Sequence, residues 1–372
     1  MGRRRAFRVR LFAVGLFAVG LLAAPEAEAA PIPDPVPPVV GVKIYERHGD
    51  ARRLFADFQD LGFNTLFVSE SLASDAEFRA QARQHRMAVF LIQPVFFDAE
   101  ELKRRPELFA ITDAGAPARD DWVAFVCPSR EEYRRRKADA IAKAAARLEP
   151  DGISLDFIRF FTYWEMIRPE RTSGSIPNTC FCRTCLDRFS RETGVSLPRD
   201  ATRPQQAAAW IETQHLESWT DWKCRIISSM VEDVVRRVHA ARPGTKVNLH
   251  AVPWRRGDFG GASRKVVGQD LPTLSRMTDY VSPMCYSAML QREPSWIASV
   301  VKDFASQASA PILPSIQVKE YYPGDQRLDA AAFEACVRSA LEPPSAGVVF
   351  WSWDLIEKAP ESRLVIKRHF NP

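Results

Sequence analysis

Short apolar runs recur along the chain, and the stretches between them carry apolar residues at helical spacing. Residues 51–61 are one such stretch, because Leu54, Phe55, Phe58 and Leu61 fall on one helical face. This alternation predicts a parallel α/β protein, since parallel strands need a crossover between them that is usually a helix. Eight strands are expected, at Val42–Tyr45, Thr65–Ser69, Ala88–Val95, Gly152–Ile158, Lys246–Val252, Tyr280–Tyr286, Ile312–Val318 and Val348–Trp353.

Eight strand–helix units favour a (β/α)8 TIM barrel over residues 41–360, with an insertion after the fourth strand at 161–245 and a tail at 361–372. Further helices are expected over 75–85, 130–148 and 217–241, and an extra strand over 122–126. The alternative is a doubly wound open sheet, which usually begins with a Gly-rich phosphate loop. Because no such loop follows the first strand, we expect the barrel.

The first 29 residues have the pattern of a signal peptide: five arginines, an apolar run, and then the small-x-small sequence Ala27-Glu28-Ala29. The alternative is a membrane anchor, for which the apolar run is short. Residues 30–40 form a Pro-rich linker, and we expect a secreted or periplasmic protein that meets the membrane only during export. Removing five arginines and two glutamates lowers the net charge from +5 to about +2, so no nucleic-acid partner is expected.

Polar and aromatic side chains follow the expected strands, at the end where TIM barrels carry their catalytic residues. Aromatic rings stack on sugar rings, and carboxylates and amides bind sugar hydroxyls. Only His250 among the histidines lies at a strand end, so metal catalysis is disfavoured and no catalytic cofactor is expected. The candidate substrate-binding residues are Tyr45, Glu70, Gln93, Arg159, His250, Trp254, Tyr286, Gln317, Trp351 and Trp353.

Asp156 interrupts an apolar strand in the segment DGISLDFIRF, residues 151–160. A buried charge is costly unless it is paired or has a function. One interpretation makes Asp156 catalytic, and the other makes it the partner of Arg159 in an ion pair that closes the barrel. Its position at a strand end favours catalysis.

The same segment resembles the fourth-strand motif of the bacterial glycosyl-hydrolase-like TIM-barrel families. Further resemblances to these families lie at 126–129 (VCPS), 267–271 (VGQDL), 278–286 (TDYVSPMCY) and 347–353 (GVVFWSW). A more distant resemblance is to family 18 chitinases, through Asp151, Gly152, Asp156 and Tyr286. Ile158 stands where those chitinases carry their catalytic glutamate, so their mechanism does not carry over. The resemblance implies a glycoside hydrolase with a carbohydrate substrate.

Such an enzyme needs two carboxyl groups, one as nucleophile or base and one as acid. Asp156 is the candidate for the first role, held ionised by Arg159. The acid is expected in an apolar setting that raises its pKa, and Asp354, behind Trp351 and Trp353, has one. Glu320 and Glu70 are rivals. A separation of about 5–5.5 Å predicts a retaining enzyme, and about 6.5–9.5 Å an inverting one.

The seven cysteines include one cluster, Cys180, Cys182 and Cys185, within the expected insertion. Three closely spaced thiolates suit a structural zinc with one further ligand, but export also favours disulfides, and both readings stay open. Cys127 and Cys224 are the candidates for a fourth ligand or a bridge partner. Cys285 and Cys336 lie in apolar segments and are expected to pack in the core.

The leading hypothesis is a secreted or periplasmic hydrolase that cleaves an oligosaccharide or polysaccharide with Asp156. The alternative is a carbohydrate-binding barrel without catalysis, which the Ile158 departure supports. A polysaccharide deacetylase or lyase component is a third reading, disfavoured by the missing metal ligands. The sequence does not specify the oligomeric state.

Overall fold

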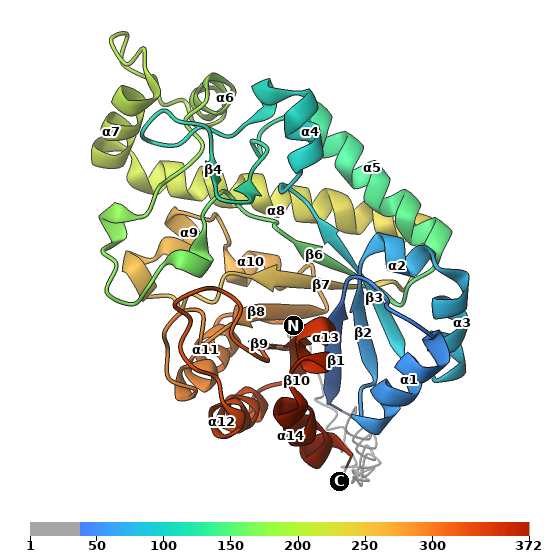
Figure 1. Cartoon of the computed structure of the whole chain (residues 1–372). Coiled ribbons are helices and arrows are strands. Elements are labelled where there is room, and N and C mark those ends of the chain that lie inside the picture. The colour runs from blue at the N-terminus through green and yellow to red at the C-terminus, as the bar shows by residue number, and fades with distance from the viewer. Residues whose placement is uncertain (1–37, 372) are drawn as a thin grey trace, which may run out of the picture. The chain divides into compact units, whose positions relative to one another are not determined.

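Eight parallel strands close into a barrel in the computed structural model, which describes residues 38–371 (Figure 1). The order around the barrel is β1-β10-β9-β8-β7-β6-β3-β2, and β1 pairs with β10 to close it, with Val39 opposite Gly347. The predicted (β/α)8 fold is therefore confirmed. The expected signal peptide (1–29) and most of the linker (30–40) lie outside the described residues.

All eight barrel strands lie within three residues of their expected bounds, and β9 is the shortest of them. Pro311 and Pro314 precede β9 and have no backbone N–H to donate to the hydrogen-bond ladder, so β9 is short. The barrel strands are β1 Val39–Ile44, β2 Thr65–Val68, β3 Ala88–Pro94, β6 Gly152–Asp156, β7 Lys246–Ala251, β8 Tyr280–Cys285, β9 Ser315–Gln317 and β10 Gly347–Trp351.

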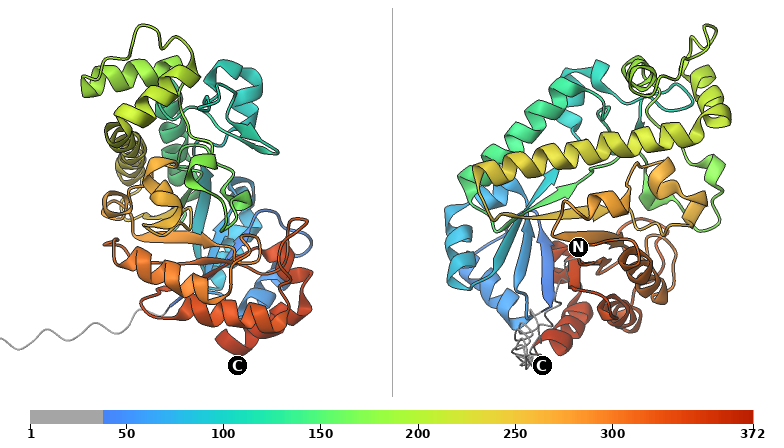
Figure 2. Two further views of the ribbon diagram at one scale, coloured as in Figure 1. Left: turned by 90° about the vertical axis from the view of Figure 1, so that its left-hand side faces the viewer. Right: turned by 180° about the vertical axis from the view of Figure 1, so that it is seen from behind.

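The helices surround the barrel, and the two longest, α5 and α8, pack along one another (Figure 2). No helix in the described part of the chain is long and apolar enough to span a bilayer. The helices are α1 Ala51–Asp60, α2 Glu70–Ser74, α3 Ala76–Gln84, α4 Ala99–Arg104, α5 Glu131–Leu148, α6 Arg183–Thr193, α7 Pro204–Gln214, α8 Leu216–Ala241, α9 Ala262–Lys265, α10 Leu271–Leu274, α11 Ser295–Ala305, α12 Ala330–Leu341, α13 Trp353–Glu357 and α14 Pro360–Phe370.

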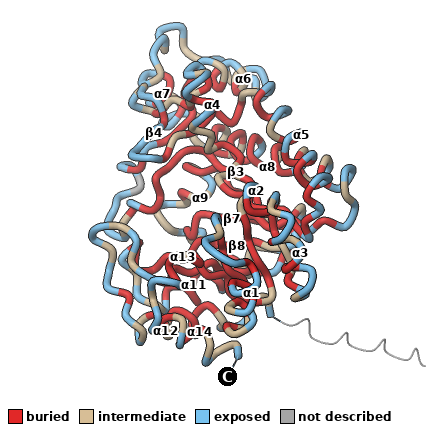
Figure 3. The backbone as a smooth tube through the Cα atoms, turned by 45° about the vertical axis from the view of Figure 1, so that its right-hand side comes forward, coloured by how far each residue is buried: buried red, intermediate tan, exposed pale blue. Residues whose placement is uncertain are grey.

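Side chains in β6 alternate between the two faces of the barrel wall. Ile153 and Leu155 pack in the main apolar core, and all five residues of β6 are buried. Buried backbone also predominates in the other barrel strands (Figure 3). Gly152, Ser154 and Asp156 share the opposite face, because side chains repeat every second residue in a strand. Asp156 therefore stands at the end of the inward-facing row, where its strand ends.

A buried polar layer crosses the barrel interior below Asp156. Ser282 Oγ donates to Asn248 Oδ1 at 2.8 Å, Asn248 Nδ2 donates to Ser154 Oγ at 2.8 Å, and Ser154 Oγ lies 2.9 Å from His250 Nε2. All four side chains are almost fully buried. Pairing buried polar groups with one another avoids the cost of leaving them unsatisfied.

The expected extra strand at 122–126 forms in part, as the second strand of a short antiparallel hairpin. Strands β4 (Arg119–Asp120) and β5 (Val123–Ala124) pair antiparallel, and Asp121 and Trp122 form the turn between them. Asp121 has φ 47°, a left-handed conformation that Asp adopts more readily than most residues. Trp122 therefore sits at the tip of a tight turn rather than inside a strand.

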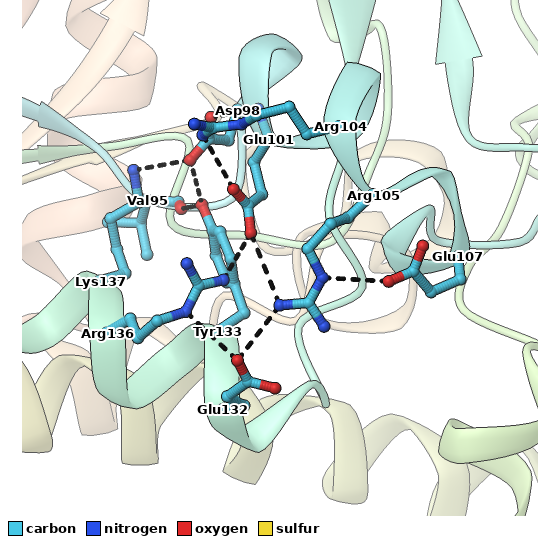
Figure 4. Close-up of polar contacts among 10 residues, drawn as sticks. All are labelled: Val95, Asp98, Glu101, Arg104, Arg105, Glu107, Glu132, Tyr133, Arg136 and Lys137. Carbon is cyan, nitrogen blue, oxygen red and sulfur yellow. Dashed lines mark hydrogen bonds and ion pairs between the residues drawn. The ribbon is translucent and has the colours of Figure 1, made fainter.

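A network of charged side chains ties the segment after β3 to α5 (Figure 4). The Glu101 side chain is 7% exposed and pairs with Arg104 at 2.9 Å and with Arg136 at 2.5 Å. Tyr133 donates to the Val95 carbonyl oxygen at 2.7 Å and to Asp98 at 3.1 Å. These contacts fix the base of the segment that carries the β4–β5 hairpin.

Candidate active site at the barrel mouth

A cavity of about 430 Å³ opens at the C-terminal ends of the strands, where TIM barrels place their active sites. Five of the predicted site residues line it together: Tyr45, Asp156, Arg159, Tyr286 and Trp351. The remaining lining residues are Lys43, Ile92, Pro94, Phe97, Trp122, Phe157, Trp164, Glu165, Met284, Met289, Tyr321 and Tyr322.

Asp156 is 9% exposed, and its carboxylate accepts a hydrogen bond from the Phe157 backbone N–H at 2.8 Å. Phe157 has φ 49°, which is uncommon for a residue other than glycine and turns the chain sharply after the carboxylate. The predicted ion pair with Arg159 does not form in the described structure. The Arg159 guanidinium instead donates to the carbonyl oxygens of Phe160 and Thr162, at 3.3 and 2.9 Å.

Lys43 lines the cavity but was not among the residues predicted from the sequence. Its side chain projects inward from β1, is 1% exposed, and donates to Tyr286 Oη at 3.2 Å. Burial lowers the pKa of Lys43 to about 8, and the negative charge of Asp156 opposes that shift. A cation of this kind stabilises negative charge inside the cavity. The only sequence signal was a lysine within the apolar run VKIY.

Glu165 is the second missed residue, and its environment is unusual for a carboxyl group. It lies in the short 3-10 helix Trp164–Met166, is 8% exposed, and its Oε2 has no hydrogen-bond partner among the described residues. Burial raises the pKa of Glu165 to about 7, and the Asp156 charge adds to the rise while Arg159 opposes it. A carboxyl group with this pKa is protonated about half the time at neutral pH.

The three carboxyl groups that the sequence favoured as acid do not line the cavity. Asp354 lies in the first turn of α13 and accepts from Ser352 Oγ. Glu320 Oε1 accepts from the Leu328 backbone N–H at 2.6 Å. Glu70 pairs with Arg147 at 2.6 Å on the outside of the barrel. All three are engaged with neighbouring groups rather than turned toward Asp156.

The other predicted binding residues do not line the cavity. Gln317 accepts from the Met289 backbone N–H at 3.0 Å, and His250 lies in the polar layer beneath, where burial lowers its pKa to about 3. Gln93 donates to Glu70 at 3.3 Å. Trp254 lines a separate cavity of about 370 Å³ beside β7, and Trp353 packs on Phe58 in the helical layer.

Aromatic rings form two walls of the cavity. Tyr286 and Trp351 stack with their ring centroids 4.6 Å apart and their planes at 16°. The Tyr321 ring extends this wall, with its centroid 5.0 Å from that of Trp351. Phe97 and Phe157 stack at 4.8 Å on another side. A concave site with apolar walls and a few buried charged groups is typical of small-molecule binding.

The cysteine cluster lies apart from the residues that line this cavity. The sulfur atoms of Cys127, Cys180, Cys182 and Cys185 lie within 4.8 Å of one another, and all four are buried. Cys127 Sγ is 3.6 Å from Cys182 Sγ and 3.3 Å from Cys185 Sγ, near the separation of about 3.8 Å that tetrahedral Zn–S bonds imply. The four thiols therefore fit a structural metal such as zinc.

The remaining cysteines lie elsewhere. Cys224, the other candidate for a fourth ligand, contacts the Arg264 carbonyl oxygen at 3.9 Å instead. Cys285 and Cys336 are buried in the core, as predicted.

No family model matches the sequence, and no curated protein matches it. Several solved structures are similar to this chain. The glycoside hydrolase domain of PgaB (BpsB) from Bordetella bronchiseptica is 12% identical, with a TM-score of 0.67, over 89% of this chain and 98% of that one. The β-galactosidase of the Antarctic haloarchaeon Halorubrum lacusprofundi is 14% identical, with a TM-score of 0.63, over 88% of this chain and 57% of that one.

The α-L-fucosidase isoenzyme 2 of Paenibacillus thiaminolyticus is 13% identical, with a TM-score of 0.56, over 89% of this chain and 48% of that one. This chain thus spans about half the length of the galactosidase and fucosidase chains but nearly all of the PgaB domain. The similarity to family 18 chitinases stays a prediction. At these identities the likeness concerns the fold: this chain has the barrel architecture found in glycoside hydrolases.

Proposed function

We propose that the chain hydrolyses a glycosidic bond, with Asp156 and Glu165 as its two carboxyl groups. One observation carries the proposal: both line the same aromatic cavity at the barrel mouth, and burial raises the pKa of Glu165 to about 7. Two carboxyl groups in different protonation states are what glycoside hydrolysis requires.

In this mechanism Glu165, when protonated, donates its proton to the glycosidic oxygen of the leaving sugar. Asp156, as a carboxylate, acts on the anomeric carbon directly or through a water molecule. Lys43 and Tyr286 lie beside Asp156 at the cavity floor and orient the sugar by hydrogen bonding. The aromatic walls hold the faces of the sugar rings. The substrate is an oligosaccharide or polysaccharide that the protein meets after export.

The test is a screen of the protein lacking residues 1–29 against galactosides, fucosides and bacterial exopolysaccharides, amino-sugar polymers included. Asp156→Asn and Glu165→Gln should each lower kcat by at least about a hundredfold while keeping glycan affinity, since each removes one working carboxyl group. Glu320→Gln is the matched control, because Glu320 lies outside the cavity lining. Cleavage that survives Asp156→Asn would refute the assignment. Binding without cleavage by the unaltered protein would favour the carbohydrate-binding alternative.

We also propose that the four-cysteine cluster holds a structural zinc ion. Its support is the burial and close packing of four thiols contributed by two segments that are distant in sequence. The protein purified without chelator should contain one zinc per chain by elemental analysis. Cys127→Ser should lose the zinc, whereas Cys336→Ser, which alters a core cysteine outside the cluster, should retain it. A full complement of disulfides in the purified protein would contradict the proposal.

A further inference from the structure

A hydrogen bond crosses the mouth of the cavity. Trp122, at the tip of the β4–β5 hairpin between β3 and α5, donates from Nε1 to Tyr322 Oη at 3.0 Å. Tyr322 follows β9. In the barrel order, β3 and β9 stand opposite each other, with three strands between them in either direction. The contact therefore joins segments from opposite sides of the barrel, and both residues line the cavity.

Neighbouring groups hold both residues of the hydrogen bond from Trp122 to Tyr322, which we call the bridge, in place. The Trp122 ring packs edge-on against Phe97, with centroids 5.5 Å apart, and against Tyr163 at 6.2 Å. The Tyr163 ring also packs edge-on against the Tyr322 ring, with centroids 6.4 Å apart. A third aromatic residue, from the segment after β6, therefore supports the bridge.

The Tyr322 end is anchored by a carboxylate. Asp325 Oδ2 accepts hydrogen bonds from the backbone N–H groups of Tyr321 and Tyr322, at 2.8 and 3.1 Å. The same oxygen accepts from Gln317 Nε2 at 3.0 Å, which ties the loop to β9. The segment that carries Tyr322 is thus fixed to the barrel rather than attached only by its ends.

A closed bridge restricts how a polymer can reach the carboxyl groups beneath it. An unbroken glycan chain cannot pass under the bridge sideways, so it must enter the cavity by one of its ends. The cavity volume, about 430 Å³, lies toward the small end of the usual range for ligand sites, about 300–1,000 Å³. We infer that the site acts on the ends of glycan chains, and that Trp122 and Tyr322 exclude internal linkages. This inference rests on the proposed glycosidase function.

The test compares chain ends with chain interiors. The probes are hexasaccharides of galactose and of N-acetylglucosamine, either with free ends or with a bulky fluorophore on both ends. The unaltered protein should shorten the free chains from one end and leave the doubly blocked chains intact. Trp122→Gly, which removes one side of the bridge, should cut the blocked chains and raise the share of internal cleavage several-fold. Tyr322→Phe, which removes only the accepting hydroxyl, should give a smaller change in the same direction.

Tyr280→Phe is the matched control, because it also removes one tyrosine hydroxyl, but Tyr280 stands at the start of β8 and does not line the cavity. It should keep the end-cleaving product pattern. Internal cleavage by the unaltered protein would overturn the inference and leave the proposed hydrolysis standing. Binding of free but not blocked chains, measured by tryptophan fluorescence without any cleavage, would support the restricted entry and refute the hydrolysis. Equal binding of both kinds of chain would overturn the inference whether or not cleavage occurs.

Discussion

Replacing Glu165 with Gln should stabilise the folded protein, and the gain should grow with pH. Burial raises the pKa of Glu165 from its ordinary value of 4.5 to about 7. Between these values the folded state binds more protons than the unfolded state, so the free energy of unfolding falls as pH rises. Each pH unit between the two pKa values lowers the free energy of unfolding by about 1.4 kcal/mol. Above pH 7 the charged carboxylate therefore costs the folded state about 3 kcal/mol in all. Gln has nearly the same shape and does not ionise.

The measurement is urea unfolding of both proteins, followed by tryptophan fluorescence, at pH 4.5 and at pH 8. The difference in unfolding free energy should grow by about 3 kcal/mol in favour of Glu165→Gln. His250, whose pKa burial lowers to about 3, is present in both proteins, so its contribution cancels in the difference. Glu320→Gln checks whether losing a carboxylate outside the cavity has the same effect.

A difference that stays constant between the two pH values would refute the reasoning. It would mean that Glu165 is solvated in the folded state or firmly paired, and its assignment as the general acid would lose its physical basis. A stabilised variant that has also lost glycan cleavage would link the cost of burial to catalysis, because active sites commonly keep groups that destabilise the fold.

Three further predictions follow from the same structure. Above pH 7, kcat/KM should fall by about tenfold per pH unit as Glu165 of the free protein loses its proton, and a pH–rate profile of kcat/KM checks this. Cys127→Ser, or a chelator, should lower the melting temperature by several degrees as well as the zinc content, as differential scanning calorimetry and elemental analysis would show. Gly152→Ala should cost about 1–3 kcal/mol in urea unfolding, because its Cβ would lie 2.3 Å from the Phe90 ring.

The barrel was predictable because strand and helix periods are local properties of the sequence. Each apolar run marks a strand, and the rule that active sites lie at strand ends was enough to place Asp156 at the cavity. The same rule failed for Asp354 and Glu320. A strand end specifies a height on the barrel but not the direction of a side chain, and these two carboxylates turn to nearby serine and backbone donors.

Glu165 and Trp122 could not be found in this way, because both lie in long connections that have no repeating period. Their positions depend on contacts across the barrel, such as the bond from Trp122 to Tyr322, between residues 200 positions apart. Lys43 was hidden for a different reason. In a strand buried on both faces, the sequence does not show which face points into the barrel.

If the protein is exported as proposed, the cysteine cluster makes the order of metal binding and oxidation matter. Four thiols that lie within 4.8 Å of one another are close enough to be oxidised in pairs as well as to bind a metal ion. An ion bound first holds the sulfurs as thiolates in one arrangement, and oxidation first would use the same sulfurs in disulfides that exclude the ion. The segment between Cys127 and Cys185 contains both Asp156 and Glu165, so either outcome ties together the two ends of the stretch of chain that supplies these carboxyl groups to the cavity.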